Sequence, residues 1–256
     1  MSDHPVLIPT SIGPIGGMVS EPDGERRAAA ILSAGVGGER FGVNQLWTSL
    51  ARDLASEGLV TLRPDYPGGK GDSLMAAKDA RPAPFMEVVS WFRQRTPGLD
   101  LLLLGSCYGA RLAVSVGVQE QDVLGVAFIT PTFVRWKRRG DRGEQESLVS
   151  RAKRKIKKKV GQVAPLPLDP RFGEAVTVAL ERMPVWAIVG ERDHRCRTDV
   201  FKLREMLPET SRDGLVIEEV PGFILHTQPS LEGQRTTRER VVDWASRLLD
   251  QEVAVR

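Results

Sequence analysis

The pentapeptide Gly-Ser-Cys-Tyr-Gly at residues 105–109 places a thiol between two glycines, directly after an apolar run. In a strand, sharp turn and helix of this kind, the turn carries a nucleophile, and the residues two positions away must lack side chains. The start of the following helix also favours a thiolate through its partial positive charge. We therefore predict that Cys107 is an acyl-accepting nucleophile. The alternative is a small, buried and inert cysteine at a tight turn.

A carboxylate and an imidazole follow this thiol in the order acid, then base. The sequence has three histidines, and one of them, His4, lies near the N-terminus. We predict that His226 takes the thiol proton and that Asp193 orients the imidazole and stabilises its charged form. Alternatively, Asp193 is a helix N-cap and His226 an ordinary loop residue. His194 and Glu191 are the substitutes if other loop positions face the thiol.

Two backbone N–H groups are needed to stabilise an oxyanion formed next to the thiol. One is predicted to come from Tyr108, the residue after the nucleophile. The other is predicted to come from Val36 in the Gly-Val-Gly turn at residues 35–37, where a chain without side chains can approach closely. The alternative is that these glycines only allow the chain to reverse.

Short apolar runs alternate with longer amphipathic segments, which is the pattern of a mostly parallel sheet flanked by helices. An antiparallel pair of strands is expected at the N-terminus, within residues 6–22. Further strands are expected at 28–34, 59–64, 99–105, 123–130, 185–190 and 214–220, and helices at 44–58, 84–95, 108–118, 199–207 and 238–251. The tryptophans on these elements are interpreted as core residues: Trp47, Trp91, Trp186 and Trp244.

The strand pattern is interrupted at residues 131–183. In this segment Val149, Ala152, Ile156 and Val160 recur at helical spacing on an otherwise cationic surface. We predict an α/β core formed by residues 1–130 and 184–256, with residues 131–183 as a basic helical insertion. Residues 135–159 hold 12 Lys or Arg and 3 acidic residues, a net charge of +9, so the rest of the chain carries about −6 of the total of +3.

The motifs GSCYG, GERD at 190–193 and GFILH at 222–226 together resemble those of the α/β-hydrolase superfamily over nearly the whole chain. The turn DYPGGKGDS at 65–73 is similar to a structural turn of that superfamily. Two features depart from it: Cys107 stands where serine is usual, and Ala34-Gly35 stands where His-Gly is usual. The resemblance implies an α/β-hydrolase fold and an acyl-transfer activity. Cysteine members of the superfamily include dienelactone hydrolases, some acyl-CoA transferases, and thioesterase-like Dieckmann cyclases that release tetramates from polyketide/peptide assembly lines.

This resemblance also implies that the basic insertion is a lid above the nucleophile. Val149, Ile156 and Val160 would then line the acyl pocket or pack the lid onto the core. A positive patch beside the entrance would attract an acidic acyl or peptidyl carrier protein that presents a phosphopantetheine thioester. The predicted docking residues are Lys153, Arg154, Lys155, Lys157, Lys158 and Lys159. The alternative is a solvated lid surface.

We therefore expect a thioesterase-like enzyme that forms an acyl-Cys107 intermediate and releases the acyl chain by Dieckmann-type cyclisation or by hydrolysis. A dienelactone-hydrolase-like or general esterase is the nearest alternative. A non-catalytic basic module that binds membrane or nucleic acid is the third, although no nucleic-acid motif accompanies the basic run.

Composition and cysteine content bear on the number of domains, the location of the protein, and its disulfides and cofactors. With 256 residues, 41% hydrophobic and 27% charged, the chain is typical of one globular domain. No apolar run approaches the roughly 20 residues of a membrane span, and the N-terminus lacks the layout of a secretory signal, which predicts a cytoplasmic location. The two cysteines are far apart and predicted to be free thiols, and neither a metal nor an organic cofactor is implied.

Overall fold

Within the described residues, eight strands form one sheet in the order β1-β2-β4-β3-β5-β6-β7-β8. The computed structural model describes residues 1–35, 39–65, 82–132, 170–221 and 230–255. β2 pairs antiparallel with β1 and with β4, whereas the other neighbours are parallel. The predicted parallel sheet with an opening antiparallel pair is therefore confirmed. The strands are β1 (Ser2–Ile8), β2 (Ile15–Glu21), β3 (Ala28–Ser33), β4 (Leu59–Pro64), β5 (Leu101–Ser106), β6 (Val123–Ile129), β7 (Val185–Gly190) and β8 (Leu215–Val220).

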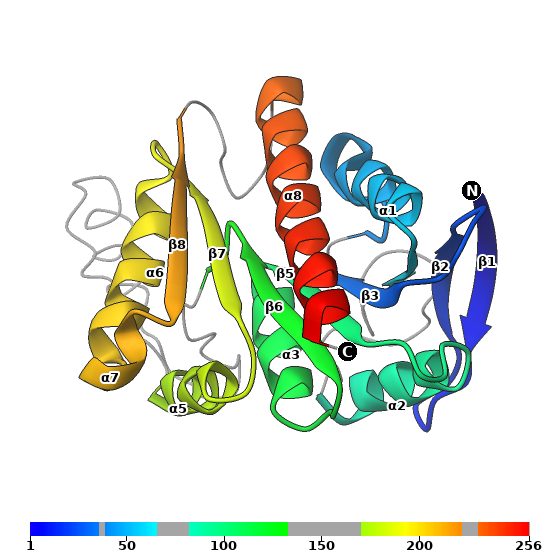
Figure 1. The fold of residues 1–256 in the computed structure, drawn as a ribbon, viewed down its shortest axis with the longest axis horizontal. Coiled ribbons are helices and arrows are strands. Elements are labelled where there is room, and N and C mark those ends of the chain that lie inside the picture. The colour runs from blue at the N-terminus through cyan, green and yellow to red at the C-terminus, as the bar shows by residue number, and fades with distance from the viewer. Residues whose placement is uncertain (36–38, 66–81, 133–169, 222–229, 256) are drawn as a thin grey trace, which may run out of the picture.

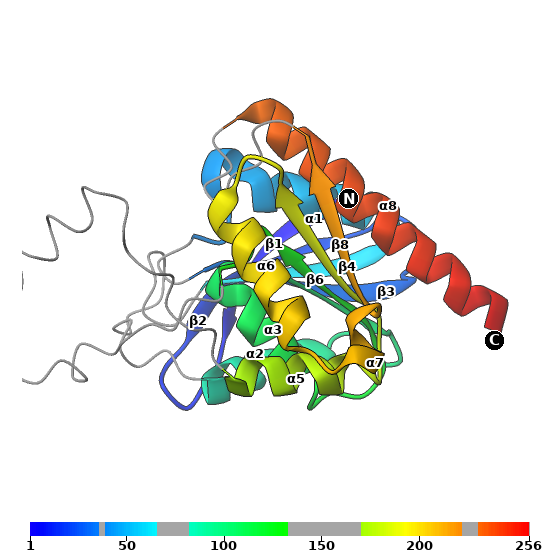
Figure 2. The same ribbon diagram turned by 90° about the vertical axis from the view of Figure 1, so that its left-hand side faces the viewer.

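Helices cover both faces of this sheet (Figure 1). One face is covered by α1 (Leu46–Ser56) and α8 (Leu231–Val255). The other is covered by α2 (Pro82–Arg93), α3 (Tyr108–Gly117), α5 (Pro170–Leu180) and α6 (His194–Met206). Figure 2 shows α1 and α8 on the upper side of the sheet and α2, α3 and α5 below it. The short elements η1 (Val43–Gln45) and α7 (Glu209–Arg212) lie before α1 and after α6 in the chain.

The central strands are buried on both faces, which explains their unbroken apolar sequences. In β5, Leu102 and Leu104 pack in the core under α1 and α8, whereas Leu101 and Leu103 pack in the core on the opposite face. This alternation follows from the two-residue period of a strand.

All four tryptophans predicted to be core residues are buried, with Trp91 the most exposed at 9%. Trp186 of β7 and Trp244 of α8 stack with their ring centroids 5.3 Å apart and an interplanar angle of 18°. This stack joins α8 to β7, the strand next to the β8 edge of the sheet.

Two helices begin earlier than their sequence patterns predicted. α6 begins at His194 because Asp193 caps it, and its first turn is polar enough to obscure the apolar periodicity. α8 begins at Leu231, although the predicted segment started at residue 238. Helix starts of this kind depend on capping contacts more than on periodicity.

The C-terminal part of the predicted insertion packs in the main core. Phe172, Val176 and Ala179 of α5 are buried in the same cluster as α3, and the ring centroids of Phe172 and Phe128 are 6.1 Å apart. Helical periodicity marks an apolar face without specifying what that face contacts, so the sequence alone did not separate α5 from the insertion. The predicted lid residues Val149, Ile156 and Val160 and the basic run at 153–159 lie outside the described residues.

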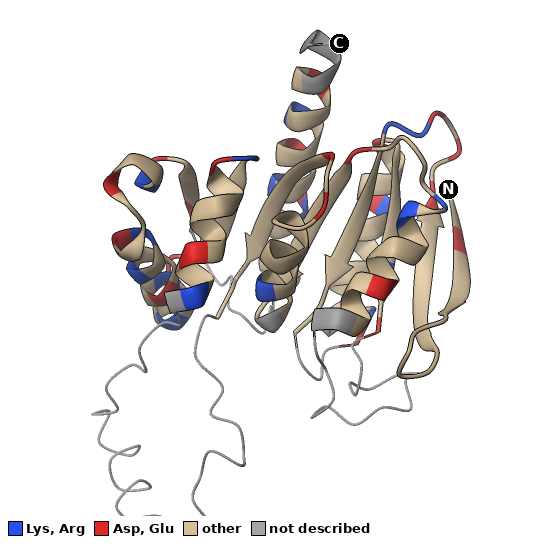
Figure 3. Ribbon diagram, turned by 90° about the horizontal axis from the view of Figure 1, so that it is seen from below, with Lys and Arg blue, Asp and Glu red and all other residues tan. Residues whose placement is uncertain are grey.

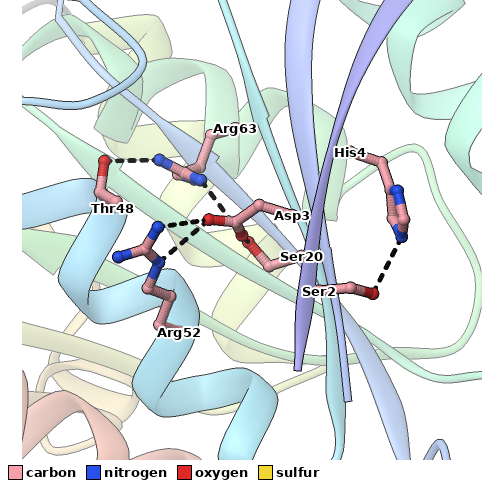
Figure 4. Close-up of polar contacts among 7 residues, drawn as sticks. All are labelled: Ser2, Asp3, His4, Ser20, Thr48, Arg52 and Arg63. Carbon is pink, nitrogen blue, oxygen red and sulfur yellow. Dashed lines mark hydrogen bonds and ion pairs between the residues drawn. The ribbon is translucent and has the colours of Figure 1, made fainter. Parts of the chain in front are cut away.

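An ionic network joins the antiparallel edge of the sheet to α1 (Figure 4). Asp3 of β1 accepts hydrogen bonds from Arg52 at 2.8 and 3.0 Å and from the Ser20 hydroxyl at 2.6 Å. Arg63 of β4, which is 3% exposed, lies 3.7 Å from Asp3 and donates to the Thr48 hydroxyl at 2.6 Å. Burial raises the pKa of Asp3, but the hydrogen bonds from Ser20 and Arg52 and the charges of the two arginines together leave it below its usual value.

Charged residues of both signs are interspersed along α8 (Figure 3). None of the helices in the described ranges is long and apolar enough to span a membrane.

Candidate active site

Cys107 occupies the turn between β5 and α3, as predicted. Its backbone has φ 51° and ψ −121°, in the positive-φ region that side chains rarely adopt. Such a conformation costs about 1–3 kcal/mol and persists where surrounding structure enforces it. The residue is partly exposed. This exposure does not match the buried cysteine of the alternative, whereas the reactivity of the thiol stays a prediction.

The glycines of the pentapeptide are required by close backbone packing. A Cβ at Gly105 would lie 2.3 Å from the carbonyl oxygen of Gly109. A Cβ at Gly109 would lie 2.1 Å from the carbonyl oxygen of Ser33, at the end of β3. No side chain fits at either distance, so the G-x-C-x-G spacing is what allows α3 to begin directly against β3 and β5.

Gly35 lies directly against the nucleophile. A Cβ built on it would be 2.8 Å from the Cys107 Cβ and 3.3 Å from its Sγ. The first residue of the Gly-Val-Gly turn is thus at the thiol, where the second oxyanion donor was expected. Val36 itself lies outside the described residues, so its role stays a prediction.

Tyr108 is the first residue of α3 and directly follows the thiol. The N–H of Ala110 bonds to the Cys107 carbonyl at 3.3 Å. Helix geometry leaves the earliest N–H groups without an intrahelical acceptor. The Tyr108 N–H therefore belongs to the first turn of α3, directly after the nucleophile, where an oxyanion donor is expected. Its role as that donor remains a prediction.

Asp193 follows β7 at the same edge of the sheet as Cys107, because parallel strands end on one side. It is 4% exposed, and its Oδ1 accepts a hydrogen bond from the Cys196 N–H at 3.1 Å. The N-cap role considered from the sequence is therefore real. A carboxylate accepts through both oxygens, so capping by one is compatible with orienting an imidazole by the other.

The predicted base, His226, lies outside the described residues, in the segment that follows β8. The strands before the two predicted partners are neighbours, because β7, which precedes Asp193, pairs in parallel with β8, which precedes the segment that contains His226. The substitutes named from the sequence, Glu191 and His194, are both exposed.

Two residues near the thiol were not identified from the sequence. The Thr132 hydroxyl, three residues beyond the end of β6, lies 3.0 Å from the Cys107 Sγ. Cys196 is fully buried, and its Sγ donates to the Thr130 carbonyl at 3.4 Å. Burial and the charge of Asp193 raise the pKa of the Cys196 thiol, so it stays protonated. A polar residue just beyond a strand adjacent to β5 was the available signal for Thr132.

Both cysteines are free thiols, as predicted. Across the described ranges, no group of three or more His, Cys, Asp or Glu side chains is arranged to hold a metal ion.

The sheet order and the strained strand–turn–helix together define an α/β-hydrolase fold, and comparison with solved structures agrees. The chain is similar to a thermostable carboxyl esterase from Bacillus coagulans, with a TM-score of 0.68 and 11% identity over 97% of this chain and 99% of the esterase. An esterase from Pyrococcus furiosus gives a TM-score of 0.69 and 14% identity over 97% and 91% of the two chains. A dienelactone hydrolase from Anabaena variabilis gives 0.64 and 15% over 95% and 96%. No protein-family profile and no curated protein sequence matches.

Proposed function

We propose that this protein is a thioesterase-like acyl-transfer enzyme that forms an acyl-Cys107 intermediate. The observation that carries the proposal is a partly exposed thiol on a strained elbow at the carboxyl edge of the sheet. Strained backbone of this kind is common at functional sites. The alignment of the α3 N-terminus behind the thiol further supports a nucleophilic role.

In the proposed mechanism, His226 removes the thiol proton and Asp193 stabilises the resulting imidazolium. The Cys107 sulfur attacks the thioester carbonyl, and the N–H groups of Tyr108 and Val36 stabilise the oxyanion. Collapse of this intermediate expels the carrier thiolate, which takes the proton from His226. The acyl group is then attached to Cys107 through a new thioester.

A cysteine nucleophile suits a thioester substrate because one thioester replaces another, and the acyl carbonyl keeps its electrophilicity. Release then follows by one of two routes. Water attacks the acyl-Cys107 carbonyl, or a carbon nucleophile within the chain does. In the second route His226 removes a proton from the carbon between two carbonyls, and the enolate expels Cys107 in a Dieckmann cyclisation.

The basic insertion supports a carrier-bound substrate. Its +9 charge at residues 135–159 contrasts with about −6 elsewhere. An acidic acyl or peptidyl carrier protein would be steered to it electrostatically, which brings the phosphopantetheine arm to the entrance. Docking by residues 153–159 is part of the proposal.

A second candidate is an esterase or dienelactone-hydrolase-like activity on small molecules. It is favoured by the fold, because solved structures similar to this chain include esterases and a dienelactone hydrolase. This candidate predicts turnover of free esters or lactones with no benefit from a carrier protein. The thioesterase-like proposal predicts the reverse preference.

The proposal is tested by incubating the protein with acyl thioesters and measuring its intact mass. We expect one acyl adduct on the peptide that contains Cys107, and its loss in Cys107→Ala. The matched control is Cys196→Ala, which removes the buried thiol and keeps the adduct. His226→Ala should slow acylation by at least about a hundredfold. An adduct that persists in Cys107→Ala would refute the mechanism, and the absence of both an adduct and thioester turnover would favour a non-catalytic basic module.

A further inference from the structure

Thr132 lies beside the sulfur to which the chemistry is assigned. Its Oγ1 is 3.0 Å from the Cys107 Sγ. Thr132 is 7% exposed, so water competes little for its hydroxyl, whereas the thiol is partly exposed. The contact joins residues that follow two adjacent parallel strands, because Ser106 at the end of β5 is paired with Ile129 at the end of β6.

The backbone between β6 and Thr132 is strained and held in place. Thr130 has φ 43°, although it is β-branched and fully buried. Its N–H bonds to the Ile188 carbonyl at 2.9 Å, and its carbonyl accepts from the Cys196 Sγ. Neighbouring β7 and α6 therefore fix the turn that precedes Thr132. Positive φ values thus occur at the ends of both strands that contribute to this contact, as is common at functional sites.

The strength of the hydrogen bond between Thr132 and Cys107 depends on whether the sulfur is protonated or ionised. A thiol is a weak donor and a weak acceptor, so the contact contributes little while Cys107 is protonated. A thiolate can only accept, and the Thr132 hydroxyl can donate to it in a charge-assisted hydrogen bond. The contact is therefore stronger for the ionised sulfur than for the neutral one.

We propose that Thr132 is a positioning residue that donates a hydrogen bond to the Cys107 thiolate and holds it at the elbow. The inference rests on the proposed nucleophilic function of Cys107. The thiolate exists before attack, and it forms again when the S–C bond breaks and its electron pair returns to sulfur during acyl release. Thr132 would stabilise it at both stages.

Other ionisable groups near this sulfur are unchanged by the proposed variants. Cys196 interacts electrostatically with Cys107, and Asp193 and Asp199 interact with Cys196. The predicted base, His226, lies outside the described residues. A difference in the pH dependence of Cys107 reactivity between the Thr132 variants consequently reports the loss of the Thr132 hydroxyl.

The test is the pH dependence of Cys107 alkylation by iodoacetamide, followed by mass analysis of the Cys107 peptide. Thr132→Val removes the hydroxyl with nearly the same shape, and we expect the midpoint of the profile to rise by about one pH unit. Thr132→Ser keeps the hydroxyl and should restore the wild-type midpoint. The matched control, Thr177→Val, removes a hydroxyl that bonds to the Gly173 carbonyl on α5, and should leave the midpoint unchanged.

A wild-type midpoint in folded Thr132→Val would overturn the inference. If that variant does not fold, Thr132→Ala carries the same expectation. Alkylation needs no acyl substrate, so the two proposals fail separately. A raised midpoint without any acyl adduct refutes the proposed function alone, whereas an unchanged midpoint with a normal adduct refutes only the role of Thr132.

Discussion

At the scale of single residues, the backbone conformation of Cys107 lowers the stability of the fold, and a glycine at this position would not be strained. The observed φ of 51° is accessible to glycine without a steric penalty. The chain nevertheless places a thiol there, which is consistent with a trade of stability for reactivity. The glycines around Cys107 favour stability instead, because they let three backbone segments approach one another without a clash.

Replacing Cys107 by glycine should stabilise the fold relative to replacing it by alanine. Glycine relieves about 1–3 kcal/mol of strain and loses about 0.5–1 kcal/mol through the entropy of its unfolded chain. We expect Cys107→Gly to be more stable than Cys107→Ala by about 1 kcal/mol, measured by urea unfolding. Equal or lower stability of the glycine variant would show that the backbone relaxes around alanine.

Replacing Gly109 by alanine should disrupt the elbow. Its Cβ would lie 2.1 Å from the Ser33 carbonyl oxygen, so the start of α3 must move away from β3. We expect a loss of about 3 kcal/mol in unfolding free energy or failure to fold. Gly24→Ala is the control, because its Cβ would meet no atom within 4 Å. Similar stabilities of the two variants, measured by thermal unfolding, would contradict this account.

At the scale of elements, β1 and β2 depend on polar contacts as well as on the core. Both strands of this antiparallel edge contribute to the Asp3 network, which also includes α1 and β4. Arg63 is almost fully buried, and removing its carboxylate partner leaves a charge that is costly to bury.

Replacing Asp3 by asparagine should therefore lower stability in a pH-dependent way. The folded-state pKa of Asp3 lies below its unfolded value, so its contribution is complete above about pH 4 and is lost as the pH falls through the folded-state value. We expect Asp3→Asn to cost about 2 kcal/mol at pH 7 and less at pH 3, measured by denaturant unfolding.

The control for this prediction is Asp213→Asn. Asp213 forms an ion pair with Arg204 but its side chain is 97% exposed, and such pairs contribute little. A loss of stability that is the same at pH 3 and pH 7 for Asp3→Asn would point to packing instead of charge.

At the scale of the whole molecule, the uneven charge distribution predicts how a partner is recognised. Charged residues of both signs occur on the described α-helices other than α3 (Figure 3), whereas residues 135–159 hold a net +9. A region with a net charge of this size attracts an oppositely charged surface over about a Debye length, roughly 10 Å at 0.1 M salt.

Neutralising the run at 153–159 with glutamine should weaken binding of an acidic carrier protein by at least about tenfold at low salt and little at 0.5 M salt. Turnover of a small acyl thioester should be unchanged. The control variant, Arg235→Gln with Arg247→Gln, removes exposed positive charge from α8. Carrier affinity that is unaltered by the glutamine substitutions at 153–159 would eliminate the docking proposal.

Much of the fold could be predicted from local patterns. β4 and β7 have the predicted bounds, and the thiol elbow and its glycines lie as expected. The start of α6 and the packing of α5 were not predicted, since they depend on a cap and on contacts with distant residues. For the candidate site, the sequence placed Cys107 at the elbow and Asp193 after its strand, with the cap made by Asp193 as an alternative, but it did not identify Thr132 as a neighbour of the thiol.

The sequence by itself determined the strand and helix order, the glycine spacing of the elbow and the separation of charge, because these follow from the short-range periodicity and steric properties of neighbouring residues. Only the tertiary structure decided which of the two cysteines is partly exposed and which hydroxyl contacts its sulfur. Thr132 and Cys107 are far apart in the chain, and their contact exists because the ends of β5 and β6 are paired, Ser106 with Ile129, and the chain turns sharply after both strands.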